Sequence, residues 1–184
     1  MKKFGICTVL LTTVLVQGCQ IPQVLGQKDT VTKASELSKS FAMTPEQFRV
    51  AMNQKLRVDN LASLVTFSPF VLNNHFFTVD HIADQQIMLE GKVNSDGQLT
   101  LIRYRSHLMD EKSLVIAMSL IKNTAKILPS VLNEKDRESS IEQIMEDAVA
   151  SPTGSAKKEI ERGIIYSASS LPNGLFEVSY QVNL

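Results

Sequence analysis

The sequence predicts an α+β domain with a largely antiparallel sheet, an N-terminal helix, and a two-helix segment before a C-terminal β-hairpin. Two observations lead to this prediction. Helix-like and strand-like segments occur in blocks rather than in alternation, in the order α-β-β-β-β-α-α-β-β. The clearest neighbouring strands are also joined by short turn sequences, which connect antiparallel strands.

The first helix is predicted to begin within the segment FAMTPEQF. Thr44 is a favourable N-cap residue, Pro45 suits the first helical position, and Gln47 completes a capping box with Thr44. Apolar residues then recur at the spacing of one helix face. They are Phe48, Ala51, Met52 and Leu56.

Four strands are expected next. LASLVTF (61–67) and HFFTVDHI (75–82) are rich in residues that favour strands. A hairpin is predicted from QIMLEGKV (86–93) and QLTLIRYRS (98–106). The intervening NSDG (94–97) suits a tight turn, because Asn and Asp tolerate left-handed backbone and Gly adopts it freely.

Two helices follow in the prediction. Asp110 is expected to cap a helix from Glu111 to about Leu128, which Pro129 ends, and a second helix runs from about Glu134 to Val149. Each has an apolar stripe with helical spacing. The stripes comprise Leu114, Met118, Ile121, Ala125 and Leu128 in the first helix, and Ile141, Ile144, Met145, Ala148 and Val149 in the second.

The C-terminal region is expected to be a loop followed by a hairpin. Residues 151–154 form the loop, and LPNG (171–174) joins the strands 163–169 and 175–182. The last strand alternates apolar and polar residues, which indicates one buried and one solvated face.

The first 18 residues have the form of a secretory signal peptide. Lys2 and Lys3 precede an uncharged, apolar stretch that is short for a membrane-spanning helix. It ends in Val16-Gln17-Gly18-Cys19, which resembles the lipobox of bacterial lipoproteins: an apolar residue at −3 and a small residue at −1 precede the cysteine, while Gln17 departs from the usual small residue at −2.

The resemblance implies that the leader is cleaved before Cys19, that Cys19 carries a diacylglyceryl thioether, and that an acyl chain such as palmitate is added to the new N-terminus. Gln20 after the cysteine, in place of Asp, implies sorting to the outer membrane in a Gram-negative cell. The alternative is an ordinary signal peptide that contains a cysteine. The other cysteine, Cys7, lies in the leader, so a lone mature cysteine favours lipidation.

These features predict three segments: a signal peptide at 1–18, a lipidated cysteine and flexible tether at 19–40, and a single α+β domain at 41–184. Loss of Lys2 and Lys3 lowers the basic residues from 19 to 17 against 19 acidic ones, a net charge of −2. This balance gives no bulk attraction to nucleic acid.

Two groups of polar residues could form a site. His75, Asp80, His81 and Asp84 could bind a transition metal. However, neighbouring residues on a strand face opposite sides, so polar strand ends and a loop explain this cluster better. A Ser155–Lys158 pair has the S-x-x-K spacing of penicillin-binding enzymes, but it lies in a predicted loop without their other motifs.

A third candidate is a cationic interaction strip. Arg103 and Arg105 lie two residues apart on one strand, with Lys92 across the hairpin, so they could meet an acidic partner or a phosphate. A solvated sheet face explains the same pattern. Met109, Met118 and Met145 are expected to fill the core rather than line a groove.

The sequence therefore predicts a lipid-anchored protein of the periplasm or outer membrane that binds another protein without catalysis, as an adaptor, assembly accessory or immunity-type module. No cofactor, metal or catalytic residue is expected. The alternatives are a carrier with a pocket for lipid or another apolar ligand, and a hydrolase in which His75, His81 or His107 lies beside a nucleophile.

Overall fold

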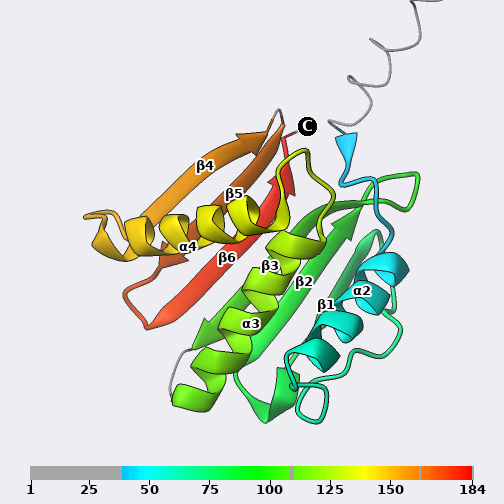
Figure 1. The fold of residues 1–184 in the computed structure, drawn as a ribbon, viewed down its shortest axis with the longest axis horizontal. Coiled ribbons are helices and arrows are strands. Elements are labelled where there is room, and N and C mark those ends of the chain that lie inside the picture. The colour runs from blue at the N-terminus through cyan, green and yellow to red at the C-terminus, as the bar shows by residue number, and fades with distance from the viewer. Residues whose placement is uncertain (1–38, 108–109, 162, 184) are drawn as a thin grey trace, which may run out of the picture.

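The computed structural model describes residues 39–107, 110–161 and 163–183. It has two layers: a six-stranded antiparallel sheet and, on one face of that sheet, the helices α2 (Pro45–Val58), α3 (Glu111–Ile127) and α4 (Glu134–Ala150) (Figure 1). The fold is thus α+β with an antiparallel sheet, as the sequence predicted. Cys19 and the predicted leader and most of the tether lie outside the described residues.

The sheet has the strand order β1-β2-β3-β6-β5-β4. The strands are β1 (Phe76–Val79), β2 (Ile87–Val93), β3 (Leu99–His107), β4 (Ser155–Glu161), β5 (Ile164–Ser170) and β6 (Leu175–Val182). Chain neighbours pair everywhere except at the centre, where β3 pairs with β6. The helices α3 and α4 connect the two three-stranded halves.

The predicted helix starts are confirmed. The Thr44 side chain accepts a hydrogen bond from the Gln47 backbone N–H at 3.2 Å, and the Gln47 side chain accepts one from the Thr44 backbone N–H at 2.8 Å. Asp110 likewise caps α3 through the Ser113 backbone N–H. The 94–97 turn is also confirmed, with Gly97 at a φ of 73° and the Asn94 side chain accepting from two backbone N–H groups.

The prediction of a strand at 61–67 is wrong, because this segment turns back against α2 immediately after the helix ends. The backbone N–H groups of Leu64 and Val65 both donate to the Leu61 carbonyl. The side-chain amide of Asn53 pairs with both backbone groups of Phe67, at 2.8 and 2.9 Å, in the way that a neighbouring strand would. The apolar pattern of the segment reflects burial of Val65 and Phe67 beneath α2, not strand formation.

The chain also forms a strand that the sequence analysis assigned to a loop. Ser155–Glu161 is β4, the outermost strand beside β5, and most of its side chains are exposed. Charged residues such as Lys157, Lys158 and Glu159 disfavour a strand by propensity, yet they suit a sheet edge because they discourage pairing with another chain. Along the chain, three strands therefore precede the helices α3 and α4, and three strands follow them.

Two of the three tyrosines fix α3 over the centre of the sheet, and the third packs against one of them. The Tyr104 hydroxyl lies 2.8 Å from Thr124 Oγ1, and the Tyr180 hydroxyl donates to the Ile121 carbonyl at 2.6 Å. Tyr166 packs edge-on against Tyr180, with ring centroids 4.7 Å apart. Burial raises the pKa of all three phenols, that of Tyr166 to about 12, so all three are neutral across the physiological range.

A close contact in the N-terminal half supports a stability prediction. The ring of Phe77 lies over Gly91 on the paired strand, and a Cβ at position 91 would come within 2.1 Å of that ring. Phe77 also stacks on Phe70, with centroids 4.3 Å apart, so the ring has little freedom to move. We expect Gly91→Ala to lower the free energy of unfolding by about 1–3 kcal/mol, as overpacking does, measured by urea denaturation.

Gly97→Asn is the matched control, because Asn tolerates a positive φ and nothing lies within 4 Å of the added Cβ. Its unfolding free energy should stay within about 0.5 kcal/mol of the native value. A Gly91→Ala protein as stable as the control would contradict the packing described for Phe77.

Candidate functional site

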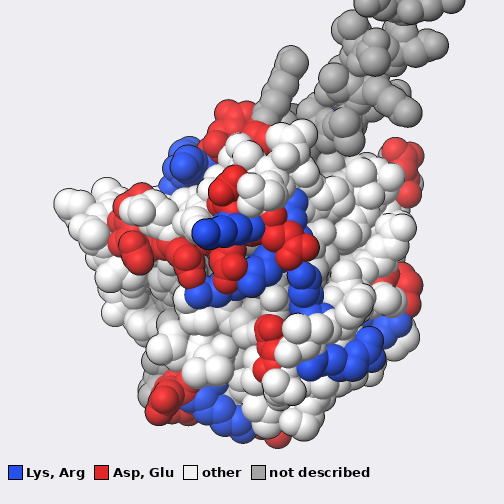
Figure 2. Space-filling view, viewed as in Figure 1, with Lys and Arg blue, Asp and Glu red and all other residues white. Residues whose placement is uncertain are grey.

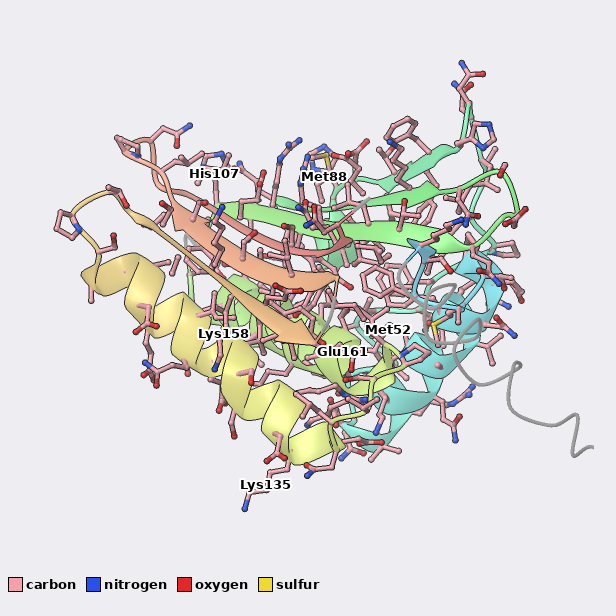
Figure 3. The ribbon with its side chains drawn as sticks, turned by 90° about the horizontal axis from the view of Figure 1, so that it is seen from above. Met52, Met88, His107, Lys135, Lys158 and Glu161 are labelled. Carbon is pink, nitrogen blue, oxygen red and sulfur yellow. The ribbon has the colours of Figure 1, made fainter. Side chains whose placement is uncertain are left out.

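The face of the sheet opposite the helices carries the predicted interaction strip. Met88 and His107 point away from the helices on this face, whereas Met52 lies on the helix side (Figure 3). Arg103 and Arg105 share the uncovered face with Met88, since the β2–β3 register pairs Met88 with Arg105. The prediction that both arginines share one face is therefore confirmed.

The arginines do not present unopposed charge. Arg105 Nε donates to Glu177 Oε2 at 2.7 Å, and one terminal nitrogen of Arg105 and one of Arg103 each lie 3.6 Å from Glu90 Oε2. Arg103 Nε lies 3.5 Å from Glu177 Oε1. The hydrogen bond from Arg105 to Glu177, followed by the attraction of both carboxylates, raises the pKa of Arg105. Two arginines and two glutamates thus form a neutral network across β2, β3 and β6.

Lys92 lies apart from this network. Its Nζ lies 5.4 Å from the centroid of the Phe76 ring on the edge strand β1, in the range of a cation–π contact. Its register partner is Leu101 rather than either arginine. Lys92, Arg103 and Arg105 therefore share a face, but only Lys92 among them lacks a carboxylate within 4 Å in the described residues.

The His/Asp residues lie in connections around β1. His75, His81 and Asp84 each have a positive φ, of 67°, 53° and 57°, and the side chains of His75, Asp80 and His81 are exposed. No group of three or more His, Cys, Asp or Glu within metal-binding reach occurs among the described residues. Among the described residues, no hydrogen bond joins a histidine side chain to a Ser, Asp or Glu with which it could form a nucleophile–base pair.

A different site, which the sequence analysis did not anticipate, lies on the helix side. It is an apolar groove of about 560 Å³ between the N-terminal half of α3, the C-terminal end of α4 and the β5–β6 hairpin. Figure 2 shows a largely uncharged surface between α4 and the start of α3. The groove is lined by Leu114, Met118, Met145, Glu146, Val149, Ala150, Ser170, Gly174 and Phe176.

The groove lies at one end of the antiparallel pair formed by α3 and α4, where α3 begins and α4 ends. Leu114 and Val149 belong to the predicted apolar stripes, yet they are 43% and 70% exposed. Met145 is buried, as expected of a core residue, but both it and Met118 also form the groove wall. Met118 and Met145 therefore pack in or against the core, as expected, but they also line a groove, which was not expected. Met109 lies outside the described residues.

The sequence contains a signal for the groove, but the signal is informative only once the antiparallel pairing of α3 with α4 is known. The α3 stripe begins one turn into its helix and the α4 stripe continues to its last turn. The β5–β6 hairpin contributes two small residues, Ser170 and Gly174, together with Phe176. Apolar stripes that reach the start of one helix and the end of its antiparallel partner predict an apolar surface at that end of the pair.

The chain shows no significant similarity to any protein-family model, curated protein or solved structure. Across residues 39–107, 110–161 and 163–183, none of the helices has both the length and the apolar character that crossing a bilayer requires.

The charged network gives a testable coupling. In a double-mutant cycle of Arg105→Gln and Glu177→Gln, we expect a coupling free energy of about 0.2–1 kcal/mol, because both side chains are partly solvated. Urea denaturation of the four proteins measures it. The coupling should shrink as salt is raised to 1 M. A coupling near zero at low salt would contradict the geometry at Glu177.

Proposed function

We propose that this chain is a lipid-anchored protein of the cell envelope that binds another protein without catalysing a reaction. The anchor is the acylated Cys19, and the binding site is the apolar groove between α3, α4 and the β5–β6 hairpin. A polar tether between the lipid anchor and the domain allows the groove to meet a partner at some distance from the bilayer.

The observation that carries this proposal is the apolar character of an exposed groove. Exposed side chains such as Leu114 and Val149 are costly to keep in water unless something covers them part of the time. Methionine walls adapt to partner side chains of different shape, because the thioether chain is unbranched and flexible. These are properties of a docking surface for an apolar segment of another protein.

The groove also favours one alternative, a carrier for lipid or another apolar ligand. Its volume of about 560 Å³ falls within the range of small-molecule sites, roughly 300–1,000 Å³. Its wall is open on the outside, where residues such as Val149 and Ala150 are exposed. An open groove suits a partner that supplies the missing wall, and we therefore propose protein binding first.

The anchor has a direct test. Because a diacylglyceryl group with a further acyl chain holds a protein on a bilayer far more firmly than one chain does, we expect Cys19→Ser to move the protein from the membrane pellet to the soluble fraction. Fractionation and immunoblotting of the tagged chain measure this. A Cys19→Ser protein that still sediments with membranes would overturn the lipid anchor.

Binding through the groove is tested by site-specific photo-crosslinking in cells. A photoreactive residue at position 149 should capture one dominant protein, identified by mass spectrometry after denaturing purification. The matched control is position 58, because Val58 is 72% exposed at the end of α2 and Val149 is 70% exposed in the groove. Capture of the same protein at both positions, or of lipid alone at 149, would contradict the proposed function.

A further inference from the structure

We propose that the groove binds a segment in which apolar side chains are flanked by lysine or arginine, and that Glu146 pairs with the basic residue. This inference rests on the proposed function and adds the chemistry of the partner. It follows from the way in which charges are arranged along the contact between α3 and α4.

Ion pairs join the two helices at regular steps. Lys126 Nζ lies 2.9 Å from Glu138 Oε2, and Lys122 pairs with Glu142. Each step moves four residues along both helices, which is close to one helical turn. Counting on by four residues along each helix reaches Met118 on α3 and Glu146 on α4, and then Leu114 and Ala150.

The groove begins where this series loses its lysines. Met118, Glu146, Leu114 and Ala150 all line it. On α3 the cation is replaced by an apolar side chain, whereas on α4 the glutamate is retained. Among the described residues Glu146 has no basic group within 4 Å, although the two preceding glutamates of its row do. An incoming lysine or arginine would continue the series.

The same arrangement selects against an anionic ligand. The groove lining has one carboxylate and, among the described residues, no lysine or arginine. The nearest basic residue in the series, Lys122, is already paired with Glu142. A fatty acid or an anionic phospholipid would place its headgroup near Glu146 without a compensating cation, which is unfavourable, whereas a basic peptide would gain an ion pair at the rim.

The test uses the full chain in phosphatidylcholine nanodiscs and two short fluorescent peptides with leucines at helical spacing. One peptide carries lysine at every polar position and the other carries glutamate. Fluorescence anisotropy, with empty nanodiscs subtracted, should show binding of the lysine peptide and much weaker binding of the glutamate peptide. Laurate should not displace the lysine peptide.

Substitutions then assign the preference to one side chain. Glu146→Gln should lower the affinity for the lysine peptide about two- to fivefold, the range expected for an exposed ion pair. It should also reduce the difference in affinity between the lysine and glutamate peptides. Asp147→Asn is the matched control: it removes the same charge from the next residue of α4, whose carboxylate accepts a hydrogen bond from Gln143 and does not line the groove.

Four outcomes would overturn the inference. Equal affinity of the native protein for both peptides would show that the groove has no charge preference. An equal loss of affinity for the lysine peptide in Glu146→Gln and Asp147→Asn would show that the preference comes from the overall charge of the surface and not from Glu146. Displacement by laurate would indicate an acyl-chain site. If photo-crosslinking at position 149 captures a protein that Glu146→Gln still binds fully, the inference about charge fails while the proposed protein binding stands.

Discussion

The pairing of β3 with β6 holds the two halves of this domain together. It joins residues 101–107 to 175–181, and it is the one sheet contact between strands that are not neighbours in the described chain. Each half alone is a three-stranded antiparallel sheet with one apolar face, which needs a further layer to be stable. Because closing so long a loop is entropically costly, the pairing depends on the helical layer that it brings into place.

That layer is fixed by α3, which lies across the junction of the two halves. Tyr104 from β3 and Tyr180 from β6 both hydrogen-bond to it, at Thr124 and Ile121. These contacts lie in the C-terminal half of the helix, so they hold that half on the sheet. The first turns of α3 extend toward the β5–β6 hairpin (Figure 1). There Leu114 and Met118 line the groove together with residues from the end of α4.

The two faces of the molecule differ in how their charged side chains are paired. On the uncovered face of the sheet, Arg103 and Arg105 are matched by Glu90 and Glu177, so this surface is polar and locally neutral. On the helical side, ion pairs between α3 and α4 stop one turn before the groove, and Glu146 remains at its rim. The groove thus combines apolar walls with one carboxylate at its rim.

The sequence by itself determined the features that depend on a few adjacent residues. These are the Thr44 and Asp110 helix caps, the Asn94–Gly97 turn and the alternation of apolar residues in β6. The acylation of Cys19 stays a prediction. The tertiary structure decided what depends on distant residues. The side chain of Asn53 pairs with the backbone of Phe67, which is therefore not in a strand, and the charged residues of β4 form a strand because they pair with β5. Glu177 neutralises Arg105, from which it is separated by 72 residues in the sequence. The groove belongs to this second group, because the same apolar residues are core or surface according to what packs over them.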